Sequence, residues 1–85
     1  MSRLTRPDTF LESIGAAISK RRNELGLSQE ELAGRSKLHR TYISDVERGI
    51  RNLSILTLDR IADALDIPIG TFFLAVKQSS KKRVR

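Results

Sequence analysis

Apolar residues recur along most of the chain at intervals of three and four positions, the spacing that gathers them on one side of an α-helix. This pattern predicts five short helices, over about residues 8–25, 28–35, 40–48, 57–65 and 68–76. No segment shows the apolar–polar alternation of a β-strand, and no segment repeats. The pattern therefore predicts an all-α fold.

The predicted helix boundaries depend on residues that begin or end helices. Ser28-Gln-Glu-Glu31 has the spacing of a capping box, in which the Ser28 and Glu31 side chains each accept a hydrogen bond from the other residue's backbone N–H. Gly26 and Gly49 are expected to end the first and third helices, because glycine adopts the left-handed conformation at little cost. The other expected boundary residues are Asp8 or Thr9 as the cap of the first helix, Thr57 as the cap of the fourth, and Pro68 in the first turn of the fifth.

The length of 85 residues suits one small domain. We expect an N-terminal arm over residues 1–7, which lack periodicity and contain a proline, then a folded domain over 8–76 and a basic flexible tail over 77–85. The longest largely apolar stretch, residues 67–76, has about half the length of a membrane-spanning helix. No apolar signal region follows the N-terminus, and the absence of cysteine suits a reducing compartment. We therefore expect a cytoplasmic protein with no membrane partner.

Charge is unevenly distributed along the chain. Sixteen basic and ten acidic residues give a net charge of +6 and a pI near 10.5. Five of the bases and none of the acids lie beyond residue 76, so residues 1–76 carry only +1. Within that part, bases concentrate over 20–51 and acids prevail over 52–76. The basic middle favours a polyanionic partner, and the basic tail would either attract DNA non-specifically or only increase solubility.

Residues 28–48 show the pattern of two short helices joined by a tight turn. Leu32 faces the expected core, and Ala33 is small where the two helices would cross; a bulky side chain there would push the second of them away. Ile43 and Val46 would close the packing from that second helix. The pattern favours a helix-turn-helix, in which the second helix enters the major groove of DNA. Its outward positions hold Arg40, Thr41, Ser44 and Asp45.

The segments Leu27-Ser-Gln-Glu-Glu-Leu-Ala33 and Tyr42-Ile-Ser-Asp-Val-Glu-Arg-Gly49 resemble the phage-repressor and Cro-like (XRE) helix-turn-helix family. The resemblance covers about residues 10–74 and implies a compact five-helix domain like that of lambda repressor. Within it, residues 39–44 and 47–53 are most similar to the controller proteins of restriction–modification systems, small dimeric regulators that bind paired operators near their own promoters. The resemblance implies a sequence-specific transcriptional regulator that binds a palindromic double-stranded DNA operator as a homodimer and blocks or recruits RNA polymerase.

The resemblance also implies which residues contact DNA. Base contacts are expected from Arg40, Thr41 and Ser44, and the planar guanidinium of arginine can reach O6 and N7 of guanine together. Contacts to the DNA backbone or the minor groove are expected from Gln29, Arg35, Lys37, His39, Tyr42, Arg51 and Asn52. Some of these residues have a plainer interpretation: Gln29 and Arg40 as solvated surface residues, His39 as a helix cap, and Tyr42 as a ring packed on the body.

Three residues are expected to act on the protein itself. The resemblance implies that Arg22 and Glu47 form a partly buried ion pair, which fixes the third helix against the first. Asp45 would repel phosphate; either it accepts a hydrogen bond from a cytosine amino group, or it orients Arg48 or Arg40, and we favour the second.

The turn between the two helices departs from the family at one position. The family usually has Gly or Asn where this chain has Lys37. If the turn keeps its usual shape, Lys37 must adopt a positive φ, at a cost of roughly 1–2 kcal/mol.

Catalysis and metal binding find little support in the composition. His39 is the only histidine, and cysteine and a glycine-rich phosphate loop are both missing. A nucleophile such as Ser28 or Ser44 would have only His39 as its base. We therefore expect no enzyme activity, no metal site, no cofactor and no small-molecule ligand.

The apolar residues near the C-terminal end exceed what one small core can bury. Leu56, Phe72, Phe73 and Leu74 are therefore expected to form a homodimer interface. The same surplus suits a heterologous partner, so the alternative function is an antitoxin or adaptor that acts mainly through another protein. Co-purification of a second polypeptide would favour this alternative.

Overall fold

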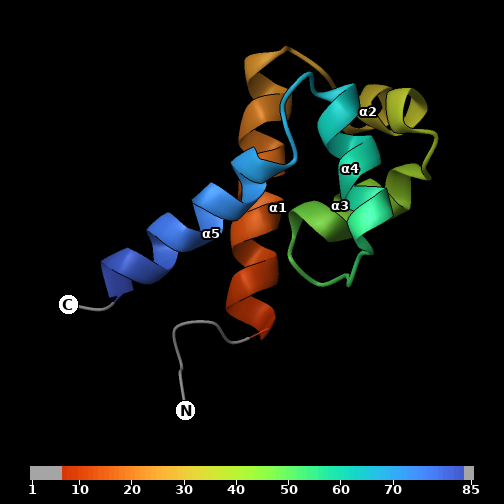
Figure 1. Cartoon of the computed structure of the whole chain (residues 1–85). Helices are drawn as coiled ribbons and strands as arrows, with labels where there is room; N and C mark the ends of the chain where they lie inside the picture. The colour runs from red at the N-terminus through yellow and green to blue at the C-terminus, as the bar shows by residue number, and fades with distance from the viewer. Residues whose placement is uncertain (1–6, 84–85) are drawn as a thin grey trace.

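The computed structural model describes the backbone of residues 7–83 and the side chains of residues 9–76. This part of the chain folds into five helices and no strand: α1 (Pro7–Glu24), α2 (Gln29–Ser36), α3 (Arg40–Glu47), α4 (Ile55–Ala64) and α5 (Gly70–Arg83). Helices α2, α3 and α4 gather on one side of α1, and α5 crosses α1 and extends away from the others (Figure 1). The predicted all-α fold of five helices is confirmed. Among the described helices, none is both long enough and apolar enough to cross a membrane.

Two helices begin earlier than predicted. Pro7 is the first residue of α1 and so belongs to the helix rather than to the arm, because a proline loses no hydrogen bond at a first helical position. The cap of α4 is Ser54, whose hydroxyl oxygen accepts a hydrogen bond from the Thr57 backbone N–H at 3.0 Å. Thr57, predicted as the cap, lies one turn inside the helix, where its side-chain oxygen accepts a hydrogen bond from the Ser54 hydroxyl.

Helix α5 begins and ends later than predicted. It starts at Gly70, so Pro68 precedes the helix rather than lying in its first turn. The helix continues to Arg83, so the predicted boundary between domain and tail at residue 77 lies inside a helix. The physical reason is local: residues 77–83 contain neither glycine nor proline, and Lys, Arg and Gln are good helix formers. The last two residues of the predicted tail, like residues 1–6 of the arm, lie outside the described residues.

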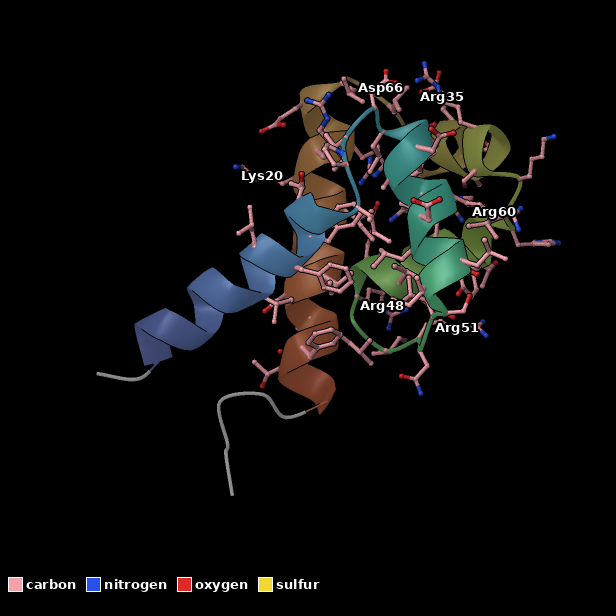
Figure 2. The ribbon with its side chains drawn as sticks, in the orientation of Figure 1. Lys20, Arg35, Arg48, Arg51, Arg60 and Asp66 are labelled. Carbon is pink, nitrogen blue, oxygen red and sulfur yellow. The ribbon has the colours of Figure 1, made fainter. Side chains whose placement is uncertain are left out.

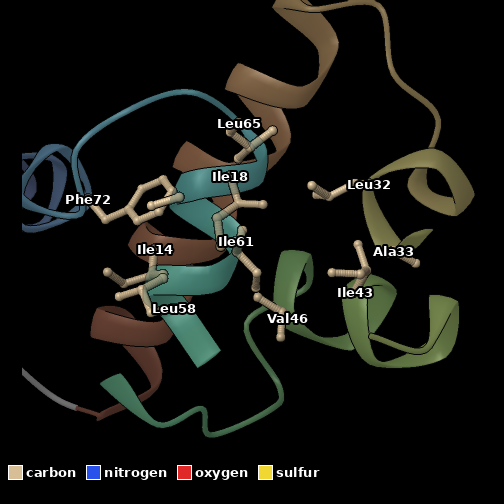
Figure 3. Close-up of a cluster of buried hydrophobic side chains, with 11 residues drawn as sticks. Ile14, Ile18, Leu32, Ala33, Ile43, Val46, Leu58, Ile61, Leu65 and Phe72 are labelled. Carbon is tan, nitrogen blue, oxygen red and sulfur yellow. The ribbon is translucent and has the colours of Figure 1, made fainter. Parts of the chain in front are cut away.

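The core lies where α1, α3 and α4 meet and is closed by α2 on one side and α5 on the other (Figure 3). Phe72 is its largest member and is fully buried near Ile14 and Leu58. It therefore cannot form the dimer interface that the sequence analysis assigned to it. A count of apolar residues does not show which of two consecutive phenylalanines points inward. The buried apolar residues are Ile14, Ile18, Leu32, Ala33, Ile43, Val46, Leu58, Ile61, Ala62, Leu65 and Phe72.

Two glycines allow α1 to approach α3 and the residues that follow it. A Cβ at Gly15 would lie 2.7 Å from the Glu47 carbonyl oxygen and closer still to that of Val46, so the two backbones are in direct contact there. Gly49 ends α3 with a φ of 75°, and a Cβ on it would lie 2.8 Å from the Cα of Glu12. The position of α3 against α1 therefore depends on glycine, which has no side chain, at both positions.

The turn between α2 and α3 has the predicted shape. The capping box of Ser28 and Glu31 begins α2, and Lys37 follows its end with a φ of 60°, as the resemblance required. Arg60 of α4 stabilises this turn, because its Nη2 donates to the carbonyl oxygens of Ser36 and Lys37 at 2.9 and 2.8 Å. These bonds satisfy carbonyl groups that the end of a helix leaves without intrahelical partners.

Candidate DNA interface

Helix α3 presents one side to the core and the other to solvent. Ile43 and Val46 are buried, whereas Arg40 and Thr41 are exposed and Ser44 is half-buried. The three predicted base-contacting side chains therefore lie on or beside the accessible side of the helix. Nothing in the described part of the chain covers Arg40 or Thr41. The side of α3 needed for entry into a groove is thus free.

His39 occupies the N-cap position of α3 without capping through its side chain. Its backbone is extended, with φ −73° and ψ 143°, and the imidazole makes no capping hydrogen bond. His39 is exposed at the N-terminal end of α3, directly after the turn. Its side chain is therefore free of the capping role that the sequence analysis offered as one alternative.

The predicted ion pair between Arg22 and Glu47 is present. Arg22 donates from Nε to Glu47 Oε2 at 2.6 Å and from Nη2 to Oε1 at 3.0 Å, and the two side chains are only 13% and 6% exposed. The hydrogen bond and the charge of Glu47 raise the pKa of Arg22, although burial opposes this shift. Arg22 Nη1 also donates to the Leu27 carbonyl oxygen at 2.7 Å. The pair therefore joins α1, α3 and the start of the helix-turn-helix.

Gln29, predicted to anchor a phosphate, is partly engaged in this network. Its side-chain Nε2 donates to Glu47 Oε1 at 3.0 Å, so the residue is half-buried rather than fully solvated. An amide nitrogen carries two hydrogens, and the bond to Glu47 uses one of them. The contact fixes Gln29 at the N-terminal end of α2, where backbone N–H groups and the helix dipole favour an anion.

A second cluster forms where the chain leaves α3. The Asp45 carboxylate lies 3.8 Å from Arg48 Nη1 and 3.4 Å from Arg51 Nη2. The Arg51 guanidinium also lies over the Tyr42 ring, with its Cζ 4.9 Å from the ring centroid. Asp45 therefore pairs with Arg48, one of the two arginines named in the favoured alternative, and with Arg51 in addition. No interaction joins it to Arg40 among the described contacts.

The remaining predicted contacts are exposed cations and polar groups around α3. Arg35 and Lys37 are exposed at the end of α2 and in the turn, and Asn52 is exposed in the loop after α3. In Figure 2, Arg35 and Arg51 both lie on the side of the molecule away from α5, with Arg35 at the top and Arg51 below it. These exposed residues thus precede and follow α3 in the chain.

Sequence reasoning missed two residues that shape this surface. Arg60 lies in the segment 52–76, where acids prevail and no pattern marks it, yet it donates to two carbonyl groups of the turn. Gly15 lies within a helix, and a glycine in a predicted helix interior is the signal that could have revealed a close approach of backbones.

The predicted self-association surface is only partly available. Leu56 and Leu74 are 70% and 59% exposed and Phe73 is 39% exposed, whereas Phe72 belongs to the core. Ile55, which the sequence analysis omitted, is 65% exposed next to Leu56. Of these residues, Ile55 and Phe73 line a shallow apolar depression of about 160 Å³, together with Phe10, Leu11, Ile14, Asn52, Leu53, Ser54 and Leu58. Leu74 instead lines a separate depression, beside Ala16 and Ala17 of α1.

Comparison with known proteins agrees with this geometry. A sequence model described as helix-turn-helix matches residues 18–72, which is more than half of the chain. The chain belongs to the helix-turn-helix family. Control protein C.BamHI of Bacillus amyloliquefaciens is 49% identical over 47 residues, which are 55% of this chain and 58% of that protein. Control protein C.SmaI of Serratia marcescens is 45% identical over 58 residues, 68% of this chain and 69% of its own.

Solved structures extend the comparison to most of this helix-turn-helix chain. The restriction–modification controller protein C.Esp1396I, solved as a tetramer with its natural 35-base-pair operator, superposes with a TM-score of 0.74 at 39% identity. The match covers 84% of this chain and 93% of the controller protein. The helix-turn-helix protein is therefore a homologue of restriction–modification controller proteins in both sequence and fold.

Proposed function

We propose that this protein is a transcriptional regulator that binds a palindromic double-stranded DNA operator as a homodimer, in the manner of a restriction–modification controller protein. The observation that supports the proposal is that one side of α3 is exposed while the opposite side is packed against the core. Its outer side is exposed, while its inner side is fixed by Ile43, Val46 and the ion pair of Glu47 with Arg22. A rigid helix with a free polar side is what direct reading of base edges requires.

The proposed roles of the side chains follow from their places around α3. Arg40, Thr41 and Ser44 read base edges, and Arg35, Lys37 and Arg51 contact phosphates or the minor groove. The part of Gln29 that Glu47 leaves free, together with the start of α2, receives a phosphate. Binding, rather than catalysis, is the proposed activity.

A homodimer provides the symmetry that such an operator needs. Half-sites about 34 Å apart, one turn of DNA, require two recognition helices related by a two-fold axis. Leu56, Phe73 and Leu74, together with Ile55, are among the exposed apolar residues, and two copies would bury them. We therefore propose these four residues, without Phe72, as the core of the interface.

Selection from random double-stranded DNA by the purified protein tests the proposal. The expected result is a recovered palindrome with half-sites one helical turn apart, bound by a symmetric dimer. Affinity for it should fall about 10³- to 10⁵-fold between 50 and 200 mM salt if the dimer makes ~6–10 phosphate contacts. Recovery of no common sequence would contradict the proposal.

A second candidate function is that of an antitoxin or adaptor. The exposed apolar side chains favour it, because Leu56 and Leu74 would fit a different protein as well as a second copy. Purification from the native host distinguishes the two functions. A stoichiometric second polypeptide supports the adaptor, whereas a homodimer that binds the selected palindrome supports the regulator.

A further inference from the structure

We propose that Asp45 is a positioning residue that holds Arg51 on the Tyr42 ring and thereby raises discrimination between the operator and other DNA. This inference deepens the proposed function and depends on it. It starts from an apparent conflict, because Asp45 places a negative charge among the cations of the surface that would meet phosphate.

The cluster has the geometry of a clamp on one arginine. Tyr42 and Asp45 lie three positions apart in α3, so their side chains are neighbours on the helix surface. Arg51 lies across both, with its Nη2 3.4 Å from Asp45 Oδ2 and its Cζ 4.9 Å from the ring centroid. The ring restrains the guanidinium from one direction and the carboxylate restrains it from another.

The backbone delivers Arg51 to this place. The Ile50 N–H donates to the Asp45 carbonyl oxygen at 3.1 Å, and Gly49 reverses the chain with its positive φ. The loop therefore folds back on α3, and the backbone of Arg51 lies near Asp45. A long flexible side chain nevertheless has many rotamers, and its ordering costs conformational entropy. A side chain that is ordered before binding spares part of that cost in the complex.

The charge of Asp45 affects the affinity for non-specific DNA and the affinity for the operator differently. Non-specific binding depends on the attraction of cations to phosphate, and a carboxylate within a Debye length of the duplex weakens it. Specific binding also depends on side chains placed where their partners lie, and the ordered Arg51 favours it. The carboxylate, with only 24% of its side chain exposed, thus lowers the affinity for arbitrary DNA more than the affinity for the operator.

The first measurement needs no DNA. Tyr42 is the single tyrosine of the chain, which has no tryptophan, so intrinsic fluorescence reports on this ring alone. We expect Asp45→Asn to make the fluorescence more accessible to acrylamide, a neutral quencher, because the guanidinium leaves the ring. Asp66→Asn is the control: it removes the same charge at a site far from Arg51 in Figure 2, and asparagine tolerates the φ of 59° found there.

The second measurement compares the affinities for the selected operator and for a scrambled duplex of the same composition. Asp45→Asn should strengthen binding to the scrambled duplex by about 3- to 10-fold and leave operator affinity equal or weaker, because only the former is governed by charge alone. Asp66→Asn should change both affinities by the same small factor. In an Arg51→Ala background, Asp45→Asn should no longer change the ratio of the two affinities, since the two residues act as a pair.

The outcomes separate this inference from the function on which it depends. If the wild-type protein selects no DNA sequence, the proposed function fails, while the quenching still decides whether Asp45 holds Arg51. Equal quenching of the wild type and Asp45→Asn would overturn the positioning. An unchanged affinity ratio in Asp45→Asn, or the same change in the Arg51→Ala background, would overturn its role in discrimination. Circular dichroism of each variant verifies that the fold is retained.

Discussion

Replacement of Arg22 by methionine tests how the recognition helix is held. The substitution keeps the aliphatic stem but removes both hydrogen bonds to Glu47 and the one to the Leu27 carbonyl oxygen. Within the described part of the chain, the Glu47 carboxylate, 6% exposed, then keeps only the hydrogen bond from Gln29. Removal of one partner from a buried pair costs about 3–5 kcal/mol, because the other charge stays buried without compensation.

This loss is large for a small domain. At roughly 0.05–0.15 kcal/mol per residue, a chain of this size has a stability of about 4–13 kcal/mol. The melting temperature of Arg22→Met should fall by about 12 °C or more, at roughly 4–8 °C for each kcal/mol. Since the pKa of Arg22 is raised, the contribution of the pair is present at neutral pH and is lost only as the pH rises through that elevated value.

Urea unfolding followed by circular dichroism measures the effect. Lys20→Met is the matched control in α1, because the Lys20 side chain is 80% exposed and its pair with Glu24 should contribute about 0.5 kcal/mol or less. The double variant Arg22→Met/Glu47→Leu should lose less stability than Arg22→Met, since it buries no unpaired charge. A loss below about 1 kcal/mol in Arg22→Met, indistinguishable from the control, would show that the pair contributes no more than an exposed one.

Four further predictions follow from the same structure. Lys37→Gly should be neutral or stabilise the protein by up to about 1–2 kcal/mol in urea unfolding, because glycine adopts a φ of 60° without strain; a clear loss would show that the turn tolerates lysine for another reason. Gly15→Ala should destabilise the protein by about 1–3 kcal/mol or more because its Cβ would collide with α3, whereas Gly34→Ala, at an open helical site, should stabilise it by about 0.5–1 kcal/mol. Similar melting temperatures for the two variants would contradict the close approach of the α1 backbone to α3 at Gly15. Arg40→Ala should cost about 1–3 kcal/mol of operator affinity and relax preference at one base pair per half-site; equal weakening for every sequence would make it a phosphate contact. Hydrogen bonds at the start of α2 lower the pKa of Glu31, so the stability that Glu31 contributes is present above the usual glutamate pKa and is lost as the pH falls through the lowered value. In Glu31→Gln, melting temperatures measured over a series of pH values should lack this loss of stability at acid pH, and a pH profile equal to that of the wild type would contradict the cap's role.

Features that depend on neighbours along the chain follow from the sequence pattern alone. Helical spacing, the capping box of Ser28 and Glu31, and the end of α3 at Gly49 were all predictable, because each depends on residues within one or two turns of each other. The positive φ of Lys37 and the pair of Arg22 with Glu47 were predictable only through the family resemblance.

Features that join distant segments arise only when the helices pack together. Phe72 and Phe73 are equivalent in the sequence, and only the packing of α5 on α1 and α4 buries the first and exposes the second. Arg60 finds its carbonyl partners 23 and 24 residues away, at a distance that no local pattern encodes. Arg51 reaches Tyr42 and Asp45 because the loop reverses after α3. Local propensities are short-range, whereas the choice of the buried face and the place of a long cation emerge only when the helices pack together.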